Sequence, residues 1–516
     1  MNEGGLKSSG LLALRLWLAR DEGSTSGRAM VVSLAAVVAL NFAARGQTVF
    51  APLYSPDSYA LLDSKMGDVL IDRLGNGRFG GAALEYGLAA LGFPLVRSAS
   101  AEVFIAIFVF VAAGWLFAKA IFDEARPREA FVFAALFTLS PLVSEVFYFS
   151  EATLRTALAQ LGAAAAAWAA FAPNAGGRYN WRAAAAAFVT ASVYQLLISY
   201  LAVVGVFRLL RLLSSPDARR EGRDWLAGAA SLAVGLALYF VAAQIPKFIW
   251  PEIASGRMYA GEAVGLAARF AYWLEVVAVA LFPPESLAPP LVSALTLAVV
   301  AASVVLAVRA LAQAGGVVRA ATGVGLAIAS LAASQIVFFV APDSFLTARL
   351  MAPVTLAIAG LVVFGWRAAD LRVRSWISIA LAIVFLGDLG SSASLLFEQR
   401  RLNRWELGEA ERAIARLEAR ADFAPGMALT VVGSQWRYPF ASAGSWGTLK
   451  VSSLRASWSQ PGVIKEATGY QFAQPSAAAS AAAARYCAQN RPWPAAEAAT
   501  VLDAVAVVCL PNEAAN

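Results

Sequence analysis

The sequence predicts an all-α, polytopic membrane protein that ends in a small α/β domain outside the membrane. Of the 516 residues, 59% are hydrophobic and only 15% are charged, whereas about 25% are charged in an ordinary soluble domain. Apolar runs of roughly 20 residues, the length that crosses a bilayer, recur through most of the chain. From Glu398 onward the composition changes to charged helical and short β-like stretches.

The composition also limits the chemistry. The chain has no histidine and only two cysteines, which excludes an imidazole base, a histidine-ligated metal and a cysteine-rich cluster. Acid–base chemistry must therefore use Asp, Glu, Lys or Tyr, and no metal or other cofactor is predicted. A formal charge of +7 would suggest nucleic acid in a soluble protein. Here many arginines lie between apolar runs, as in cytoplasmic loops, so we expect no nucleic-acid partner.

The apolar runs define the predicted spans, at residues 29–46, 100–121, 129–149, 151–172, 226–246, 289–309, 317–341, 347–366 and 375–396. The stretch 183–213 is long for one span and short for two, yet the arginines on both of its flanks suggest cytoplasmic ends. We therefore expect two short helices there, bent outward near Tyr194 and Gln195, which gives about eleven spans in total.

The positive charges also predict the topology. Arg15, Arg20 and Arg28 precede the first apolar run and no cleavage motif follows it closely, so residues 1–28 are expected in the cytoplasm, before a retained span. An odd number of spans between residues 29 and 397 then places residues 398–516 outside. The short run 269–282, which prolines follow, is expected to lie as a helix at the outer surface.

The C-terminal part contains two β-like runs, 428–432 and 504–510, and both cysteines of the chain, Cys487 and Cys509. A disulfide between the cysteines fits an oxidising periplasm or cell surface. Two unrelated buried thiols are the alternative. We favour the disulfide because both cysteines fall in the part predicted to lie outside.

Residues 47–99 form a long first external loop, and long loops are usually functional. Leu62, Met66, Val69, Leu70 and Arg73 follow the spacing of one helix face. Such a helix is expected to lie in the membrane interface, and the apolar stretch 82–95 predicts a second interfacial helix. Four charged side chains turn away from the first face, namely Asp63, Lys65, Asp68 and Asp72.

The string GNGRFG, residues 75–80, matches the dinucleotide pattern G-x-G-x-x-G. Neither a preceding strand nor a βαβ unit accompanies it, so a dinucleotide site is not predicted. We interpret it as a turn between surface helices that offers backbone N–H groups and the Arg78 guanidinium to an anion. Asp57 either caps the helix that follows it or serves the function of this loop, and the residues alone leave both roles open.

Several motifs, taken in order, resemble one family. They are YSPDSY (54–59), NGRFGG (76–81), VYQLLISY (193–200), SFLTARLMAP (344–353) and the ending from Cys487 to Leu510. Their order resembles the bacterial glucosyltransferase II (Gtr) type of polytopic glycosyltransferases, within the GT-C superfamily. The resemblance implies a GT-C fold with interfacial helices in the first external loop and a catalytic acid near the end of the first span.

The resemblance also implies an activity. Such enzymes move a sugar, here glucose or another hexose, from a polyprenyl-phosphate carrier to a cell-envelope glycan such as O-antigen, on the periplasmic face of the bacterial inner membrane. The expected partners are membrane lipids, the lipid-linked donor, the glycan acceptor and a small flippase. Asp57 falls on the acidic position of the family. The usual pattern there resembles two adjacent acids, whereas this chain has Ser58 in second place.

The resemblance assigns Asp57 as general base and Arg78, Arg349 and Lys65 as ligands of the donor phosphate. Alternatively, the Arg349 side chain extends to the lipid headgroups and anchors the chain at the membrane interface. The remaining candidates also have two roles each. Glu145 and Glu151 assist the base or cap a helix, and Tyr194 and Gln195 bind the acceptor sugar or link helices. The aromatic side chains of the terminal domain stack on sugar rings or fill a small core, and they are Trp436, Tyr438, Phe440, Trp446 and Trp458.

A transporter or flippase for lipid-linked saccharides is the main alternative, and a non-catalytic scaffold is another. A transporter would be expected to show internal repeats and charged or broken helices at mid-membrane. The sequence shows no convincing repeat, and its acids gather in the predicted external loops. This distribution favours chemistry at the membrane surface over passage through it.

Overall fold

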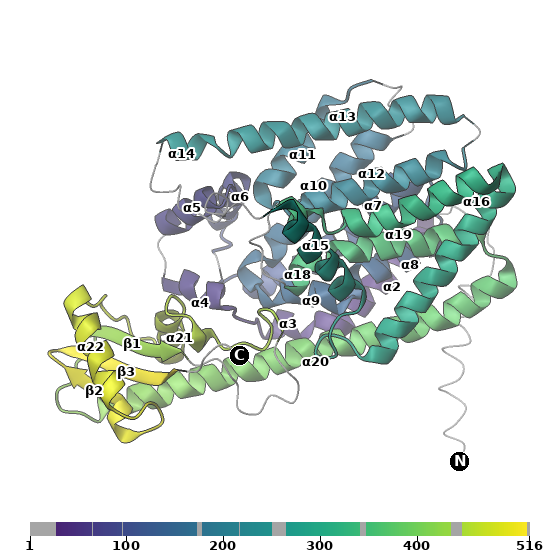
Figure 1. The fold of residues 1–516 in the computed structure, drawn as a ribbon. Helices are drawn as coiled ribbons and strands as arrows, with labels where there is room; N and C mark the ends of the chain where they lie inside the picture. Colours follow the sequence, from purple (N-terminus) through teal and green to yellow (C-terminus); the bar gives the residue numbers. More distant parts are fainter. Residues whose placement is uncertain are drawn as a thin grey trace, which may run out of the picture.

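The computed structural model describes residues 27–63, 66–94, 96–172, 178–215, 217–249, 265–340, 347–434 and 446–512. A large helical bundle stands beside a small sheet domain, and the long helix α20 runs along the bundle into that domain (Figure 1). The polytopic all-α class with a small C-terminal sheet domain is thereby confirmed. Among the sequence candidates, Lys65 and the aromatic residues Trp436, Tyr438 and Phe440 lie outside the described residues.

Six helical segments among the described residues are long and apolar enough to cross a membrane. They are α2 (Gly27–Arg45), α7 (Ala99–Phe122), α13 (Ala218–Ala242), α16 (Pro290–Ala333), the pair α18 (Ala348–Met351) with α19 (Pro353–Ala368), and α20 (Leu371–Glu418). A bent pair adds a seventh, α8 (Pro127–Leu139) with α9 (Pro141–Tyr148). The expected count of about eleven spans therefore stays a prediction.

The other expected spans form helices that are shorter or more polar. The stretch 183–213 forms α11 (Trp181–Val193) and α12 (Leu197–Leu212), separated near Tyr194 and Gln195 as the sequence predicts. Helix α10 (Ser150–Phe171) is long enough to span, but polar side chains such as Arg155 lower its mean hydropathy. The expected surface helix forms α15 (Leu266–Leu281).

Two expected boundaries differ in the structure. The expected span 129–149 bends by 57° between α8 and α9, where Pro141 lacks an N–H and the Ser140 hydroxyl accepts from the N–H of Leu142 instead. The expected spans 289–309 and 317–341 are continuous in α16, apart from a kink at Gly315 and Gly316, and a short α17 (Ile336–Val340) follows.

The first loop folds into α3 (Gln47–Phe50), α4 (Pro56–Asp63), α5 (Met66–Gly75) and α6 (Phe79–Ala90). The prediction that Leu62 to Arg73 lie on one face of a single helix is wrong in part, because Leu62 belongs to α4 and the other residues belong to α5. Val69 and Arg73 are buried, whereas Leu70 is 46% exposed. The turn Asn76–Arg78 joins α5 to α6, and Gly77 has φ 69° there, as expected of a glycine-containing turn.

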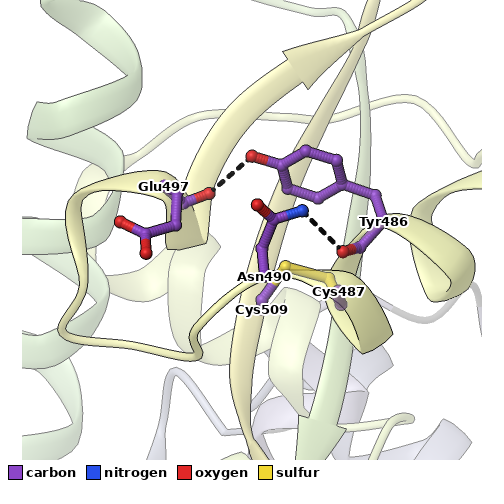
Figure 2. The surroundings of a disulfide bond; sticks show 5 residues. All are labelled: Tyr486, Cys487, Asn490, Glu497 and Cys509. Atoms are coloured by element: carbon purple, nitrogen blue, oxygen red, sulfur yellow. Dashed lines mark hydrogen bonds between the residues drawn. A yellow bond between two sulfur atoms is a disulfide. The ribbon is translucent and has the colours of Figure 1, made fainter.

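The C-terminal domain has a three-stranded sheet in the order β1–β3–β2, made of β1 (Ala428–Ser434), β2 (Ala499–Leu502) and β3 (Val505–Asn512). Strand β1 pairs with β3 in parallel, and β2 pairs with β3 as a hairpin. The helices of the domain are α21 (Gln460–Thr468) and α22 (Ala477–Gln489), with short 3₁₀ turns η2 (Ser453–Arg455) and η3 (Ala496–Ala498). A disulfide joins Cys487 of α22 to Cys509 of β3 (Figure 2).

The bundle is held together by buried apolar side chains from nearly all of its helices. Large apolar side chains also remain on its outer surface, for example Val305 on α16, which is 65% exposed. An apolar outer face of this kind suits contact with lipid tails. The end of α20 packs against the sheet, so one helix takes part in both the bundle core and the core of the C-terminal domain.

Candidate active site

Asp57 lies in the first turn of α4 and its side chain is exposed. Ser55, two residues before Asp57, and Ser58, directly after it, are buried and form reciprocal hydrogen bonds. The Ser55 hydroxyl accepts from the N–H of Ser58, and the Ser58 hydroxyl accepts from the N–H of Ser55, each at 3.0 Å. This reciprocal pair caps the helix. Because Ser55 takes the capping role, the exposed carboxylate of Asp57 is left for another function.

Ser58 connects α4 to the helix that carries Glu151. Its hydroxyl donates to a carboxylate oxygen of Glu151, which is 3% exposed. A charge interaction also links Glu151 to Asp57. Ser58, at the position where the resembled family usually has a second acid, therefore contacts an acid from α10. The structure places a second carboxylate next to this motif, although the motif itself has only one.

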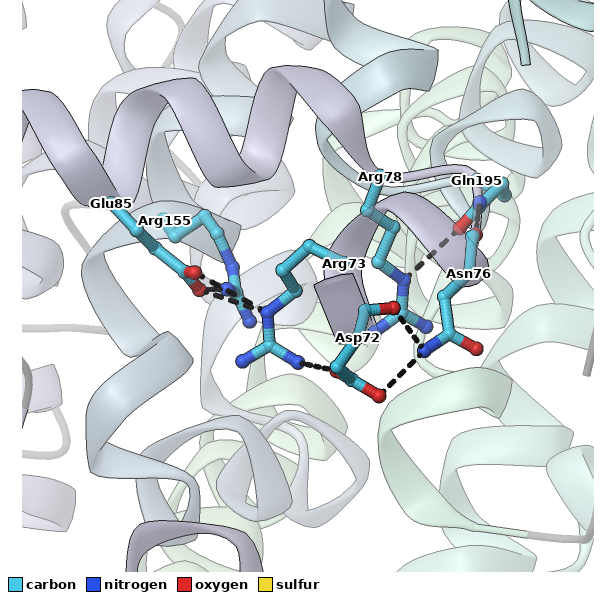
Figure 3. A network of polar contacts seen from close by, with 7 residues as sticks. All are labelled: Asp72, Arg73, Asn76, Arg78, Glu85, Arg155 and Gln195. Carbon is cyan, nitrogen blue, oxygen red and sulfur yellow. Dashed lines mark hydrogen bonds and ion pairs between the residues drawn. The ribbon is translucent and has the colours of Figure 1, made fainter. Parts of the chain in front are cut away.

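Arg78 follows the glycine turn and reaches the break between α11 and α12. Its Nε donates to Gln195 Oε1 at 3.2 Å, and its guanidinium lies 5.1 Å from the centre of the Tyr194 ring. Gln195 Nε2 donates in turn to the carbonyl oxygen of Asn76 at 2.6 Å. The structure thus brings Arg78, Tyr194 and Gln195 together. Figure 3 shows Gln195 in contact with both Arg78 and Asn76, so this residue of the break holds the turn that bears Arg78.

A second group of charges adjoins this turn (Figure 3). Arg73 of α5 pairs with Glu85 of α6 at 3.2 Å, and Arg155 of α10 also pairs with Glu85. Arg73 additionally contacts Asp72 at 2.9 Å. Glu85 is 2% exposed, and a buried charge of this kind requires such partners. Sequence reasoning missed Arg155, although an arginine inside an apolar run is itself unusual.

Asp57 interacts electrostatically with arginines from two other helices, α10 and α18. Charge interactions connect Asp57 to Arg155 and to Arg349. Burial lowers the pKa of Arg78. The positive charges of Arg73 and Arg349 lower this pKa further, whereas Tyr194 raises it. The guanidinium groups of Arg73, Arg155 and Arg349 and of Arg78, in the turn before α6, therefore lie close enough for their positive charges to repel one another. Such an arrangement favours an incoming anion, which would relieve the repulsion.

Glu145 and Arg349 interact both through the backbone N–H of Arg349 and through their opposite charges. The N–H of Arg349 donates to Glu145 Oε2 at 2.6 Å, and the Thr448 hydroxyl donates to Oε1 of the same carboxylate. The Arg349 guanidinium lies 3.6 Å from the centre of the Phe149 ring. Glu145 therefore joins α9 and α18 to the segment between β1 and η2 of the C-terminal domain, while the Arg349 side chain extends toward the Phe149 ring.

The fold and the site together define a class of protein: a polytopic helical membrane protein whose first loop carries an exposed carboxylate, Asp57, and a network of buried arginines and acids. The family model described as glucosyl transferase GtrII matches residues 46–364, more than half of the chain. The chain therefore belongs to the glucosyl transferase GtrII family and is a membrane glycosyltransferase. No curated protein and no solved structure matches it significantly.

The family match covers most of the site described above. It includes Asp57, Arg78, Glu151, Arg155 and Arg349, and it ends before the C-terminal domain begins. Of the sequence candidates, Asp57, Glu151 and Arg349 are linked by charge interactions, and Arg78 is linked to Arg349 in the same way. The disulfide cysteines lie apart, in the sheet domain.

Proposed function

We propose that the protein transfers glucose or another hexose from a polyprenyl-phosphate donor to a cell-envelope glycan such as O-antigen. The observation that carries this proposal is the exposed carboxylate of Asp57 on α4, whose charge interacts with those of Arg155 and Arg349. A lipid-linked sugar phosphate offers an anionic group to the arginines and a long apolar tail to the membrane. The glycan acceptor offers a hydroxyl to the carboxylate.

The proposed reaction uses these groups in one displacement. The acceptor hydroxyl oxygen attacks the anomeric carbon of the donor sugar, and the proton of that hydroxyl passes to the Asp57 carboxylate. The bond between the anomeric carbon and the phosphate oxygen breaks, and its electron pair stays on the phosphate. Arg78 and Arg349 hold the phosphate and stabilise the charge that develops on it.

The neighbouring residues take supporting roles in this proposal. We assign Glu151 as the acid that assists Asp57, because Ser58 brings its carboxylate to the same turn. The Glu145 carboxylate already accepts two hydrogen bonds, which suits a structural role better. Tyr194 and Gln195 orient Arg78. Binding of the acceptor sugar by Tyr194 and Gln195 stays a prediction.

We further propose that the enzyme lies in the bacterial inner membrane with its N-terminus in the cytoplasm and its C-terminal domain in the periplasm. The supporting observations are the predicted charge bias and the disulfide, which suits an oxidising compartment. A reporter fused after Ala419, the C-cap of α20, tests the topology. A periplasmic signal supports the proposal, and a cytoplasmic signal overturns it.

The activity is tested with the purified full chain, radiolabelled polyprenyl-phosphate glucose and an acceptor glycan. The parent is expected to transfer the label, and Asp57→Asn is expected to reduce transfer by at least about a hundredfold. Asp503→Asn is the matched control, since Asp503 is exposed in the β2–β3 turn and Asn tolerates its positive φ of 46°. Equal transfer by the parent and Asp57→Asn would remove Asp57 as the base.

A further inference from the structure

Helix α20 carries a buried polar stripe between the part that packs in the bundle and the part that packs on the sheet domain (Figure 1). Gln399, Asn403 and Glu406 follow the i, i+4, i+7 spacing of one helix face, and each is at most 7% exposed. Buried amide and carboxylate groups of this kind require hydrogen-bond partners. Their partners include backbone groups of two other segments, the first loop and the C-terminal domain.

Asn403 binds the backbone of Tyr54 at two points. Its Oδ1 accepts from the N–H of Tyr54 at 3.1 Å, and its Nδ2 donates to the carbonyl oxygen of the same residue at 2.8 Å. Residues 52–55 belong to neither a helix nor a strand. The Asn403 side chain therefore supplies the pairing that a neighbouring strand would give to a backbone segment in a sheet.

Glu406 holds the amide of Asn403 in turn. Nδ2 of Asn403 also donates to Glu406 Oε2 at 3.0 Å, which keeps Asn403 Oδ1 turned toward the N–H of Tyr54. The other carboxylate oxygen of Glu406 accepts from the N–H of Ser453 in η2. One buried carboxylate thus orients the amide that binds the first loop and, at the same time, binds the C-terminal domain.

The position of Tyr54 determines where α4 begins. Ser55 follows Tyr54 directly and is the N-cap of the helix, and Pro56 opens the first turn with a fixed φ. Asp57 is the next residue, so two constrained residues separate it from the backbone that Asn403 binds. A shift of Tyr54 would therefore move the Asp57 carboxylate with it.

Helix α21 holds the later part of α4. The two helices are so close that a Cβ added at Gly462 of α21 would overlap the carbonyl oxygen of Tyr59. Lys465 of α21 donates from Nζ to the carbonyl oxygen of Leu62 at 3.3 Å. These contacts come after Asp57 in the chain, whereas the hydrogen bonds from α20 come before it.

We propose that Asn403 is a positioning residue, whose hydrogen bonds to the Tyr54 backbone set the place of α4 and hence of the Asp57 carboxylate. This inference rests on the proposed function, because the place of Asp57 matters for catalysis if its carboxylate takes the proton of the acceptor. A displacement of about 1 Å from the reactive geometry lowers a rate roughly a hundredfold. The part of the chain beyond residue 364, where the family match ends, would thereby help to build the active site.

The first measurement is hydrogen exchange of the full chain in lipid nanodiscs, compared between the parent and Asn403→Ala. The variant removes the acceptor of the Tyr54 N–H. Exchange in peptides that cover residues 51–59 is therefore expected to be about tenfold faster, with unchanged exchange in the rest of the bundle. Asn403→Leu also lacks the amide but fills the space, so it replaces Asn403→Ala if the cavity prevents folding.

The second measurement is sugar transfer by the same variants with radiolabelled polyprenyl-phosphate glucose. Asn403→Ala is expected to lower kcat roughly a hundredfold. The KM for the donor should stay within about twofold of the parent value, since Arg78 and Arg349 are held by other contacts. Asn490→Ala is the matched control, because the amide of Asn490 bonds to the carbonyl oxygen of Tyr486 within the C-terminal domain.

The outcomes separate the two proposals. If the parent transfers sugar and Asn403→Ala leaves kcat or the exchange of residues 51–59 unchanged, the inference is overturned while the proposed function stands. Faster exchange throughout the bundle also overturns it, because that result indicates general destabilisation, and failure of both Asn403 variants to fold has the same meaning. If the parent transfers no sugar from any lipid-linked donor, the proposed function fails. Faster exchange confined to residues 51–59 would then show a structural contact alone.

Discussion

Glu85 offers the sharpest test of the charged network in the first loop. Its carboxylate is 2% exposed and pairs with Arg73 and Arg155, whose side chains are 10% and 9% exposed. Glu85→Gln removes the charge and leaves two buried guanidinium groups facing each other. Loss of one partner of a buried ion pair costs about 3 to 5 kcal/mol. Since Arg73 also contacts Asp72, we expect the lower end of that range.

Asp72→Asn provides the matched control on the same arginine. The Asp72 side chain is 57% exposed, and an exposed ion pair contributes about 0 to 1 kcal/mol. The assay is the unfolding midpoint of the purified full chain in lipid nanodiscs, measured for both variants beside the parent. We expect a large decrease for Glu85→Gln and almost none for Asp72→Asn. Equal decreases, or no decrease in either, would refute the idea that Glu85 compensates buried charge.

Three further changes probe the contacts around Asp57. Gly462→Ala is expected to displace α21 from α4 and to lower turnover roughly tenfold, measured by sugar transfer, whereas Gly408→Ala on open α20 surface should have no effect. Ser58→Ala removes the hydrogen bond to Glu151 and should lower kcat more than it raises KM. The disulfide joins two cysteines that are 22 residues apart in the sequence. Its reduction should lower the free energy of unfolding of the C-terminal domain by about 3 kcal/mol. The unfolding midpoint should fall with reductant in the parent but not in Cys487→Ser.

Much of the fold follows from local patterns in the sequence. Apolar runs of bilayer length predict helices, and the two short helices around Tyr194 and Gln195 appear where the run 183–213 was too long for one span. The β-like runs 428–432 and 504–510 form paired strands. These features were predictable because hydrophobic periodicity and run length act over a few turns of chain.

The contacts that build the site were less predictable. Asp57 and Arg78 lie in short motifs that sequence analysis can recognise, but Arg155 lies within an apolar run. The role of Arg155 depends on how α10 packs on α6, which is tertiary information. The N-cap at Ser55 was likewise missed, because Asp57 is an equally good cap by residue type alone. The hydrogen bonds in the structure, rather than the residue types, show that Ser55 and not Asp57 is the N-cap.

Breaks in the helices recur around the site, and this recurrence has a physical reason. The bend between α8 and α9 is followed by Glu145, the break between α11 and α12 carries Gln195, and the short α18 carries Arg349. A broken helix leaves backbone groups unpaired, which a membrane protein tolerates only where polar groups or water satisfy them. The same polar surroundings permit charged side chains. Helix breaks and charged residues therefore occur together in this bundle.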